Sequence, residues 1–200
     1  MPKRLIVTAP RQVEFEEVPI PDCPGDGLLV RAKVTAVSTG TEVRVYRGIP
    51  VDKDGGFLHT FVPTFVPFRY PYINSESMVG EVLEVGIETS GFDVGDRVFV
   101  TASHRHYAAV SAQEAIKLPD TIPDEVAAVL NILEVGHIGL RKGSPQPGEN
   151  VAIIGASVIG LSALAYCRTF GFRTAVVELA RKRLDLAGAM GADLLASPED

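Results

Sequence analysis

A turn spaced by two glycines, between a short apolar strand and an apolar helix, constrains the fold of this chain most strongly. Residues 151–155 (VAIIG) predict a buried strand, and residues 156–172 (ASVIGLSALAYCRTFGF) predict a helix that closes at a glycine. A second strand (174–179), a second helix (180–192) and the start of a third strand (192–197) follow. This alternation predicts a parallel α/β sheet in the last part of the chain.

The same turn has the spacing of a diphosphate-binding loop. Gly155 permits a tight turn out of the strand, and Gly160 permits close packing of the helix on the sheet. The helix N-terminus presents backbone N–H groups and a positive dipole end to a diphosphate. The middle position of the fingerprint is Ser157, a small side chain that still allows close backbone approach. Such turns also occur in α/β folds that bind no nucleotide, so the turn alone does not decide the function.

An acid at the end of the second strand strengthens the nucleotide hypothesis. Glu178 stands where dinucleotide folds place a carboxylate that accepts hydrogen bonds from ribose hydroxyls. It would repel a 2′-phosphate, which favours NAD over NADP, although the basic residues 181–183 could soften that preference. A strand-end acid can also be a plain surface residue. The candidate cofactor-binding residues are Gly155, Ser157, Val158, Ile159, Gly160, Glu178 and Arg183.

The first 120 residues have a different pattern, with short runs rich in Val, Ile, Leu and Phe separated by turn residues. The predicted strands are residues 5–10, 13–18, 28–37, 78–85 and 97–101, which indicate a compact β unit such as a partly closed barrel. Residues 126–142 predict one or two helices. We therefore predict domains at 1–120 and 150–200, joined by a helical segment at 121–149.

Composition excludes several classes of protein. The chain is 46% hydrophobic, which is enough for a core, and its net charge of -6 disfavours nucleic acid and anionic membranes as partners. Cys23 and Cys167 form no Cys-x-x-Cys pair, and two lone cysteines do not make a disulfide scaffold or a structural zinc lobe. The sequence shows neither a secretory signal nor a membrane span, so the predicted location is the cytoplasm.

The order of short segments resembles the medium-chain dehydrogenase/reductase superfamily, the alcohol-dehydrogenase-like enzymes. The pieces are GTE at 40–42, YRG at 46–48, GEVLEVG at 80–86, VGDRV at 94–98, YAAV at 107–110, KLPD at 117–120 and PG at 147–148. Threonine/sorbitol-dehydrogenase-like members and bacteriochlorophyllide dehydrogenases look most similar. The resemblance covers essentially the whole chain and implies a GroES-like β-barrel domain followed by the first part of a Rossmann doubly wound sheet.

The resemblance also implies a function. The expected reaction is NAD(P)-dependent hydride transfer between nicotinamide and a small alcohol or ketone, in a longer protein that forms homo-oligomers. Two alternatives are a zinc-free quinone or enoyl reductase, and an inactive binding or assembly protein, the latter for these 200 residues taken alone. The aromatic insertion at 47–75 could line a bulky apolar substrate pocket or form a subunit contact.

The positions that bind catalytic zinc in the family hold other residues here. They are Thr39 in place of a cysteine, residues 74–77 (NSES) in place of a His-Glu pair, and a position near Leu130. A hydroxyl, one glutamate and a leucine do not make a zinc site, so we predict no metal. A different site built from His104, His106 and Glu76 is conceivable, but a histidine pair in a loop is the commoner arrangement.

Without zinc, hydrogen-bond donors must stabilise the developing alkoxide. By resemblance, Thr41 occupies the position of the proton-relay hydroxyl, and Arg44 lies where some relatives have a relay histidine. Tyr46 and Glu76 are further candidates for a general acid or base. Two structural roles compete with these assignments: Thr41 could cap the turn that follows it, and Arg44 could form an ion pair with Glu42.

Overall fold

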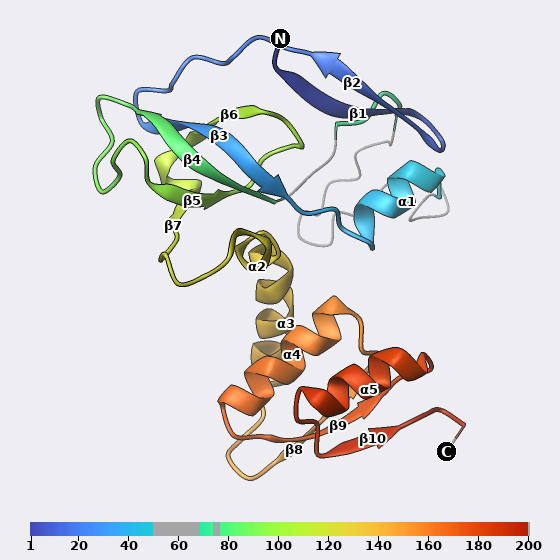
Figure 1. The fold of residues 1–200 in the computed structure, drawn as a ribbon. Coiled ribbons are helices and arrows are strands. Elements are labelled where there is room, and N and C mark those ends of the chain that lie inside the picture. Colours follow the sequence, from blue (N-terminus) through green and yellow to red (C-terminus); the bar gives the residue numbers. More distant parts are fainter. Residues whose placement is uncertain (50–68, 74–76, 200) are drawn as a thin grey trace. The chain divides into compact units, whose positions relative to one another are not determined.

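A computed structural model describes residues 1–49, 69–73 and 77–199 of the chain. The chain forms two compact units, Met1–Val129 and Leu130–Asp200. Figure 1 shows strands throughout the first unit and alternating strands and helices in the second. The predicted domain bounds, 1–120 and 150–200 with a helical segment at 121–149, stay a prediction, because the two units are separated by contacts alone.

The first unit is built from antiparallel strands. Strands β3 (Gly27–Thr35), β4 (Met78–Val85), β5 (Arg97–Val100), β6 (Tyr107–Ser111) and β7 (Ile116–Lys117) form one sheet in the order β6-β3-β4-β5-β7. Strands β1 (Lys3–Ala9) and β2 (Gln12–Glu17) form a separate hairpin. The short helices are α1 (Thr41–Arg47), η1 (Ala112–Glu114) and α2 (Asp124–Ala127).

The core of the first unit follows from alternation along its strands. Inward-facing residues of β3, β4, β5 and β6 meet in one apolar cluster, because successive side chains of a strand point to opposite faces. The buried members are Leu28, Val30, Met78, Val82, Val98, Val100, Ala108 and Val110. This cluster fixes the sheet that positions the ends of β3 and β4.

The second unit contains the predicted parallel sheet. Strands β8 (Asn150–Ile154), β9 (Arg173–Val177) and β10 (Leu194–Ala196) lie in the order β10-β9-β8, with every pair parallel. Helices α3 (Leu130–Gly143), α4 (Val158–Thr169) and α5 (Arg181–Ala189) accompany them. This is the 3-2-1 half of a doubly wound sheet. Leu140, Ile153, Leu164, Cys167 and Val176 are among the buried residues of its core.

Helices α3 and α4 pack closely because small residues face each other. A Cβ at Gly136 would lie 2.5 Å from the hydroxyl oxygen of Ser162. That hydroxyl donates to the carbonyl of Leu133 at 2.7 Å, and the His137 ring stacks on Tyr166 with centroids 4.8 Å apart. The stack accounts for His137 as a packed residue of the helix pair.

The apolar run at 126–142 forms parts of two helices, α2 and α3, and not one continuous helix. At the interruption, the carbonyl of buried Ala128 accepts a hydrogen bond from the Ser77 hydroxyl at the start of β4. In one continuous helix, the Ala128 carbonyl would accept a backbone N–H from the next turn, but here it accepts the Ser77 hydroxyl.

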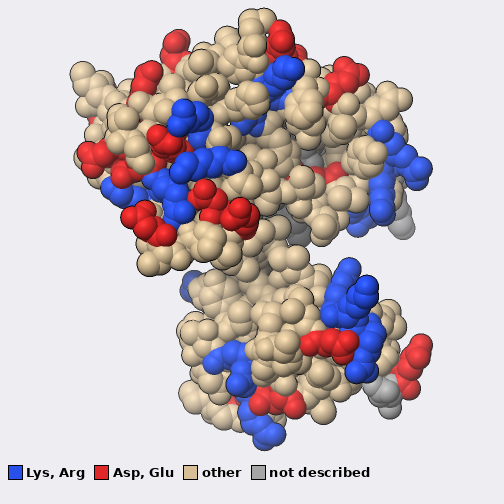
Figure 2. Space-filling view, viewed as in Figure 1, with Lys and Arg blue, Asp and Glu red and all other residues tan. Residues whose placement is uncertain are grey.

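The surface in view carries mixed charge. Figure 2 shows acidic and basic side chains interspersed on this face of both units, without one dominant basic patch. Among the described residues, none of the helices is both long enough and apolar enough to span a bilayer.

Candidate functional site

The glycine-spaced turn lies between β8 and α4. Gly155 has φ 95°, in the left-handed region that favours glycine, and its N–H donates to Val177 O at 2.7 Å. A Cβ at Gly160 would lie 1.9 Å from the Gly155 carbonyl oxygen, so the first turn of the helix can approach the loop only with glycine there. Both glycines therefore have the local roles that the sequence predicted for them.

The N-terminus of α4 is open for an anion. Ser157 is the N-cap residue, and its side chain makes no capping hydrogen bond. The first N–H groups of the helix, starting at Val158, have no acceptor within the helix. The side chains of Ser157, Val158 and Ile159 are exposed. A dinucleotide diphosphate fits this cradle, because close backbone approach, free donors and a positive dipole end coincide there.

Glu178 joins the end of β9 to the glycine turn. Its Oε2 accepts the Ala156 N–H at 2.7 Å, and its Oε1 accepts the Ala180 N–H at 2.8 Å. The N–H of Ala180, followed by that of Ala156, holds the pKa of the Glu178 carboxyl below its ordinary value. The carboxylate is thus fixed and charged beside the cradle, where it could accept ribose hydroxyls.

Arg183 contributes less than Glu178 in this arrangement. Its Nη1 lies 3.9 Å from Glu178 Oε2, and its side chain is 58% exposed. An ion pair at this distance, with the Arg183 side chain largely exposed, adds little stability. Arg183 therefore stays a candidate for nucleotide contact.

A cavity of about 580 Å³ adjoins the turn within the second unit. Gly155, Ser157, Ile159 and Gly160 line it together with residues of β8, and Gly136, Gly139 and Leu140 of α3 also line it. The loop that would hold a diphosphate therefore opens into a hollow of small and apolar side chains.

The predicted catalytic residues Thr41, Arg44 and Tyr46 lie together on the short helix α1. Gly40 is the N-cap, so Thr41 does not serve as the cap, and the Ser38 hydroxyl accepts the Thr41 N–H at 3.3 Å. Arg44 and Tyr46 are exposed. Glu76 lies outside the described residues, as do Phe57, Phe61, Phe65 and Phe68 of the aromatic insertion. The catalytic assignments therefore stay predictions.

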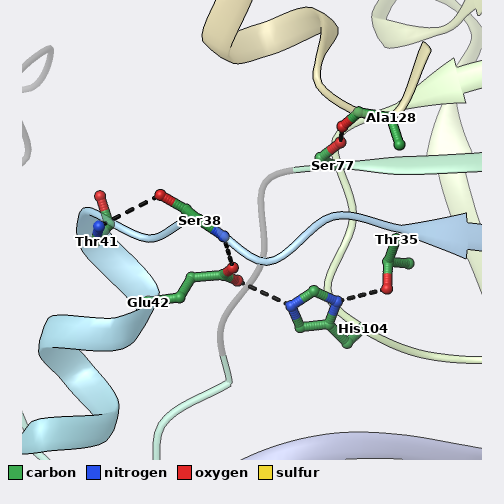
Figure 3. Close-up of polar contacts among 7 residues, drawn as sticks. All are labelled: Thr35, Ser38, Thr41, Glu42, Ser77, His104 and Ala128. Carbon is green, nitrogen blue, oxygen red and sulfur yellow. Dashed lines mark hydrogen bonds and ion pairs between the residues drawn. The ribbon is translucent and has the colours of Figure 1, made fainter. Parts of the chain in front are cut away.

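A polar array that the sequence did not predict lies beside α1 (Figure 3). His104 Nε2 lies 3.0 Å from Glu42 Oε1, and His104 Nδ1 lies 2.7 Å from Thr35 Oγ1. The side chains of His104 and Glu42 are only 10% and 6% exposed. Glu42 also accepts the Ser38 backbone N–H, so α1 and the end of β3 are tied to the segment before β6. Glu42 therefore pairs with His104, and no ion pair with Arg44 is found among the described residues.

The sequence offered only a weak signal for this array. Glu42 and His104 are separated by 62 positions, so local patterns cannot pair them. The sequence predicts His104 and His106 more often as a pair in a loop than as parts of a metal site. Both residues precede β6, where His104 is nearly buried and His106 is exposed.

Two of the family's zinc-ligand positions lie among the described residues, and they hold a threonine and a leucine. Thr39 is exposed, and Leu130 is the first residue of α3. Residues 74–76 lie outside the described part of the chain. Within that part, no group of three His, Cys, Asp or Glu residues could hold a metal ion. A threonine and a leucine lack the thiolate or imidazole that catalytic zinc requires, so the described donor set does not fit zinc.

Comparison with curated sequences finds dehydrogenases. The L-threonine 3-dehydrogenase of Aeromonas salmonicida is 31% identical over 208 residues, covering 88% of this chain and 56% of the relative. That of Idiomarina loihiensis is 32% identical, with the same coverage of 88% and 56%. The chain thus spans about 56% of the length of these relatives. No family model matches the sequence.

Solved structures share the fold. The 2R,3R-butanediol dehydrogenase of Bacillus subtilis aligns with TM-score 0.80 and 22% identity, covering 100% of this chain and 64% of that one. An Escherichia coli alcohol dehydrogenase complexed with NADH gives TM-score 0.80 and 20% identity, covering 100% and 63%. A zinc-dependent alcohol dehydrogenase of Streptococcus pneumonia gives 0.76 and 24%, covering 98% and 61%.

These comparisons confirm three predictions. The fold combines a GroES-like β domain with part of a Rossmann sheet. The sequence relatives are enzymes that are named dehydrogenases. The relatives and structural neighbours of this chain thus belong to the medium-chain dehydrogenase/reductase superfamily, as the order of its sequence segments predicted.

Proposed function

We propose that the protein is an NAD-dependent oxidoreductase that transfers a hydride between nicotinamide and an alcohol or ketone without catalytic zinc. The observation that carries the proposal is the loop after β8, where Gly155 and Gly160 form a close turn held by Glu178. When bound, the nicotinamide supplies the hydride chemistry. NADP is the less suitable cofactor, because the charged Glu178 carboxylate would repel a 2′-phosphate.

The chain's own residues would bind and orient the reactants. The N–H groups at the start of α4 would hold the diphosphate, and Glu178 would accept the ribose hydroxyls. At the substrate oxygen, Thr41 would donate or accept the proton, with Arg44, Tyr46 and Glu76 as further groups near the developing charge. Hydrogen-bond donors would thus do the work that a Lewis acid does in zinc enzymes.

The proposal includes a cytoplasmic location and a homo-oligomeric full-length form, with no nucleic acid or membrane as partner. The proposed substrate is a small-molecule alcohol or ketone with a bulky, apolar body. Because the relatives are named L-threonine 3-dehydrogenases, L-threonine is the first substrate to test, followed by larger secondary alcohols.

The test is a turnover assay that follows the absorbance of NADH, combined with metal analysis. Purified protein should reduce NAD with a secondary alcohol, and treatment with a chelator should leave the rate unchanged. Stoichiometric zinc whose removal abolishes the rate would contradict the zinc-free mechanism. Turnover of an enone but of no alcohol would indicate a quinone or enoyl reductase. Dinucleotide binding without any turnover would indicate an inactive binding protein.

A further inference from the structure

A second cavity, of about 350 Å³, lies within the first unit and is separate from the glycine turn. It is bounded by the β1–β2 hairpin, the end of β3 and the segment that precedes β6. Its walls carry both apolar and basic side chains. The lining residues from the hairpin are Lys3, Leu5 and Phe15. The remaining ones are Ala32, Lys33, Val34, Thr35 and Val37, together with His104, Arg105 and His106.

The charge around this cavity is opposite to that of the whole chain. Lys3, Lys33 and Arg105 line it, and no carboxylate does, although the net charge of the chain is -6. In the described part of the chain, none of these three cations forms an ion pair. Glu17, which lies opposite Lys3 in the β1–β2 ladder, does not line the cavity. A concave surface lined by one sign of charge concentrates ions of the other sign.

Arg105 is partly buried and lies near a second cation, Arg4. Burial of its guanidinium, and secondarily the nearby charge of Arg4, lowers the pKa of Arg105 from its ordinary value. Arg4 is already paired with Glu16 at 2.5 Å, whereas Arg105 Nε donates to the Ser103 hydroxyl. A bound anion would relieve the repulsion that Arg105 experiences.

Thr35 contributes a hydroxyl to the lining of the cavity, and this hydroxyl is hydrogen-bonded to the imidazole of His104. The ring of His104 is held from both sides, because Nε2 faces the Glu42 carboxylate at 3.0 Å and Nδ1 faces the Thr35 hydroxyl at 2.7 Å. When the Thr35 oxygen accepts the hydrogen bond that it shares with Nδ1, its own O–H is free to donate to an anion in the cavity.

We propose that this cavity is a binding site for a small organic anion. Its carboxylate or phosphate headgroup is held by the Thr35 hydroxyl and by the cations Lys33 and Arg105. Its apolar body packs against Leu5, Phe15 and Val34. The site requires neither nucleotide binding nor hydride transfer, so it can fail or succeed independently of the proposed oxidoreductase function.

The first experiment titrates the protein, without nucleotide, with isobutyrate and with methyl phosphate, and follows the histidine ring signals by NMR. The chain has four histidines, so variants with glutamine in place of single histidines assign the rings. The expected result is saturable binding of at least one anion with shifts of the His104 ring. The tighter of the two identifies the preferred headgroup. If neither anion binds saturably, or if His104 does not respond, the proposal is overturned.

Substitutions of Thr35 test the hydroxyl itself. Thr35→Val removes the donor at nearly constant volume and should weaken binding about tenfold, the effect of losing one hydrogen bond to a charged group. Thr35→Ser retains the hydroxyl and should retain binding, which separates the donor from any effect on folding. Equal affinity in Thr35→Val and the unchanged protein, or loss in Thr35→Ser with the fold intact by circular dichroism, would contradict the assignment.

A matched pair of lysine variants tests the cationic wall. Lys33→Gln should weaken binding roughly threefold, because an exposed charge contributes modestly. Lys142→Gln removes the same charge from an exposed position on α3 and should leave the affinity unchanged. Equal weakening by both variants would show that the anions respond only to net charge and would overturn the site.

Discussion

At the scale of single residues, the two glycines of the turn differ in what they require. Gly155 needs a backbone conformation that other residues adopt reluctantly, whereas Gly160 needs the space that a Cβ would occupy. Sequence spacing predicted both roles, because a strand–turn–helix with a phosphate-binding loop leaves few options at these positions.

Gly160→Ala should therefore force the start of α4 away from β8. The added Cβ would lie 1.9 Å from the Gly155 carbonyl oxygen, so we expect a loss of about 1–3 kcal/mol in the free energy of unfolding and loss of nucleotide affinity. Urea unfolding and a nucleotide titration measure the two effects.

Gly139→Ala is the matched control, because a Cβ there meets nothing within 4 Å. Gly139 lies in the middle of α3, so alanine should stabilise the protein by about 0.5–1 kcal/mol. A Gly160→Ala variant as stable as the parent protein would disprove the close approach of the turn to the helix.

Glu178→Gln tests the preference for NAD. The variant keeps the size of the side chain but loses its negative charge. That charge would repel a 2′-phosphate, and the two carboxylate oxygens would accept hydrogen bonds from the ribose hydroxyls. We expect the affinity for NAD to fall about tenfold, while the affinity for NADP stays the same or improves. Titration of both dinucleotides measures the ratio, and an unchanged ratio would remove Glu178 from the specificity argument.

At the scale of elements, the tie between α1, β3 and the segment before β6 depends on Glu42. Its carboxylate is buried and accepts from both His104 and the Ser38 N–H. Glu42→Gln replaces a buried carboxylate that contacts His104 and the Ser38 N–H with a neutral amide. Urea unfolding should therefore give a free energy of unfolding that is lower by about 1–3 kcal/mol. Arg44→Gln changes an exposed residue of the same helix and should have a small effect. Equal effects of the two variants would argue against the array.

Asp193 holds β10 to β9. Its Oδ2 accepts the Thr174 N–H at 2.7 Å and the Thr174 hydroxyl at 3.2 Å. The Thr174 N–H above all lowers the pKa of the Asp193 carboxyl below its ordinary value of 3.8. A carboxyl with a lowered folded pKa stabilises the protein fully above its unfolded pKa, and this stability is lost as pH falls through the folded pKa.

Asp193→Asn should accordingly lower the melting temperature at neutral pH. The difference between parent and variant should shrink as the pH falls below about 4. Melting followed by circular dichroism across this range gives the measurement. Asp185→Asn, which alters only an exposed pair with Arg181 on α5, is the control with a small expected shift. A constant difference at all pH values would show that the charge of Asp193 does not matter.

Helices and strands were predictable where glycine or proline bounds a run of residues with a clear hydrophobic periodicity. The strands β4, β8 and β9 and the helices α4 and α5 lie within a few residues of the predicted runs. Helix α1 was expected only as a short turn that Thr41 could cap, whereas it is a helix of 7 residues with Gly40 as the N-cap. The break between α2 and α3 depends on the contact of Ser77 with Ala128, which no local signal could reveal.

At the scale of the whole molecule, the sequence predicted a β unit followed by a parallel sheet because the hydrophobic period changes along the chain. It predicted the nucleotide loop because its residues are local. It could not predict the Glu42–His104–Thr35 array or the cavity beside it, since these join β3, α1 and the segment before β6. Local chemistry was readable from the sequence, and chemistry assembled by tertiary contacts was not.

Calorimetric titration of the purified protein with NAD and NADH tests the central claim most directly. If the loop between β8 and α4 holds a dinucleotide diphosphate, at least one of the two should release saturable heat at one site per chain, and the heat should vanish in Gly160→Ala. Absence of heat with both dinucleotides, from protein that is folded by circular dichroism, would contradict the account.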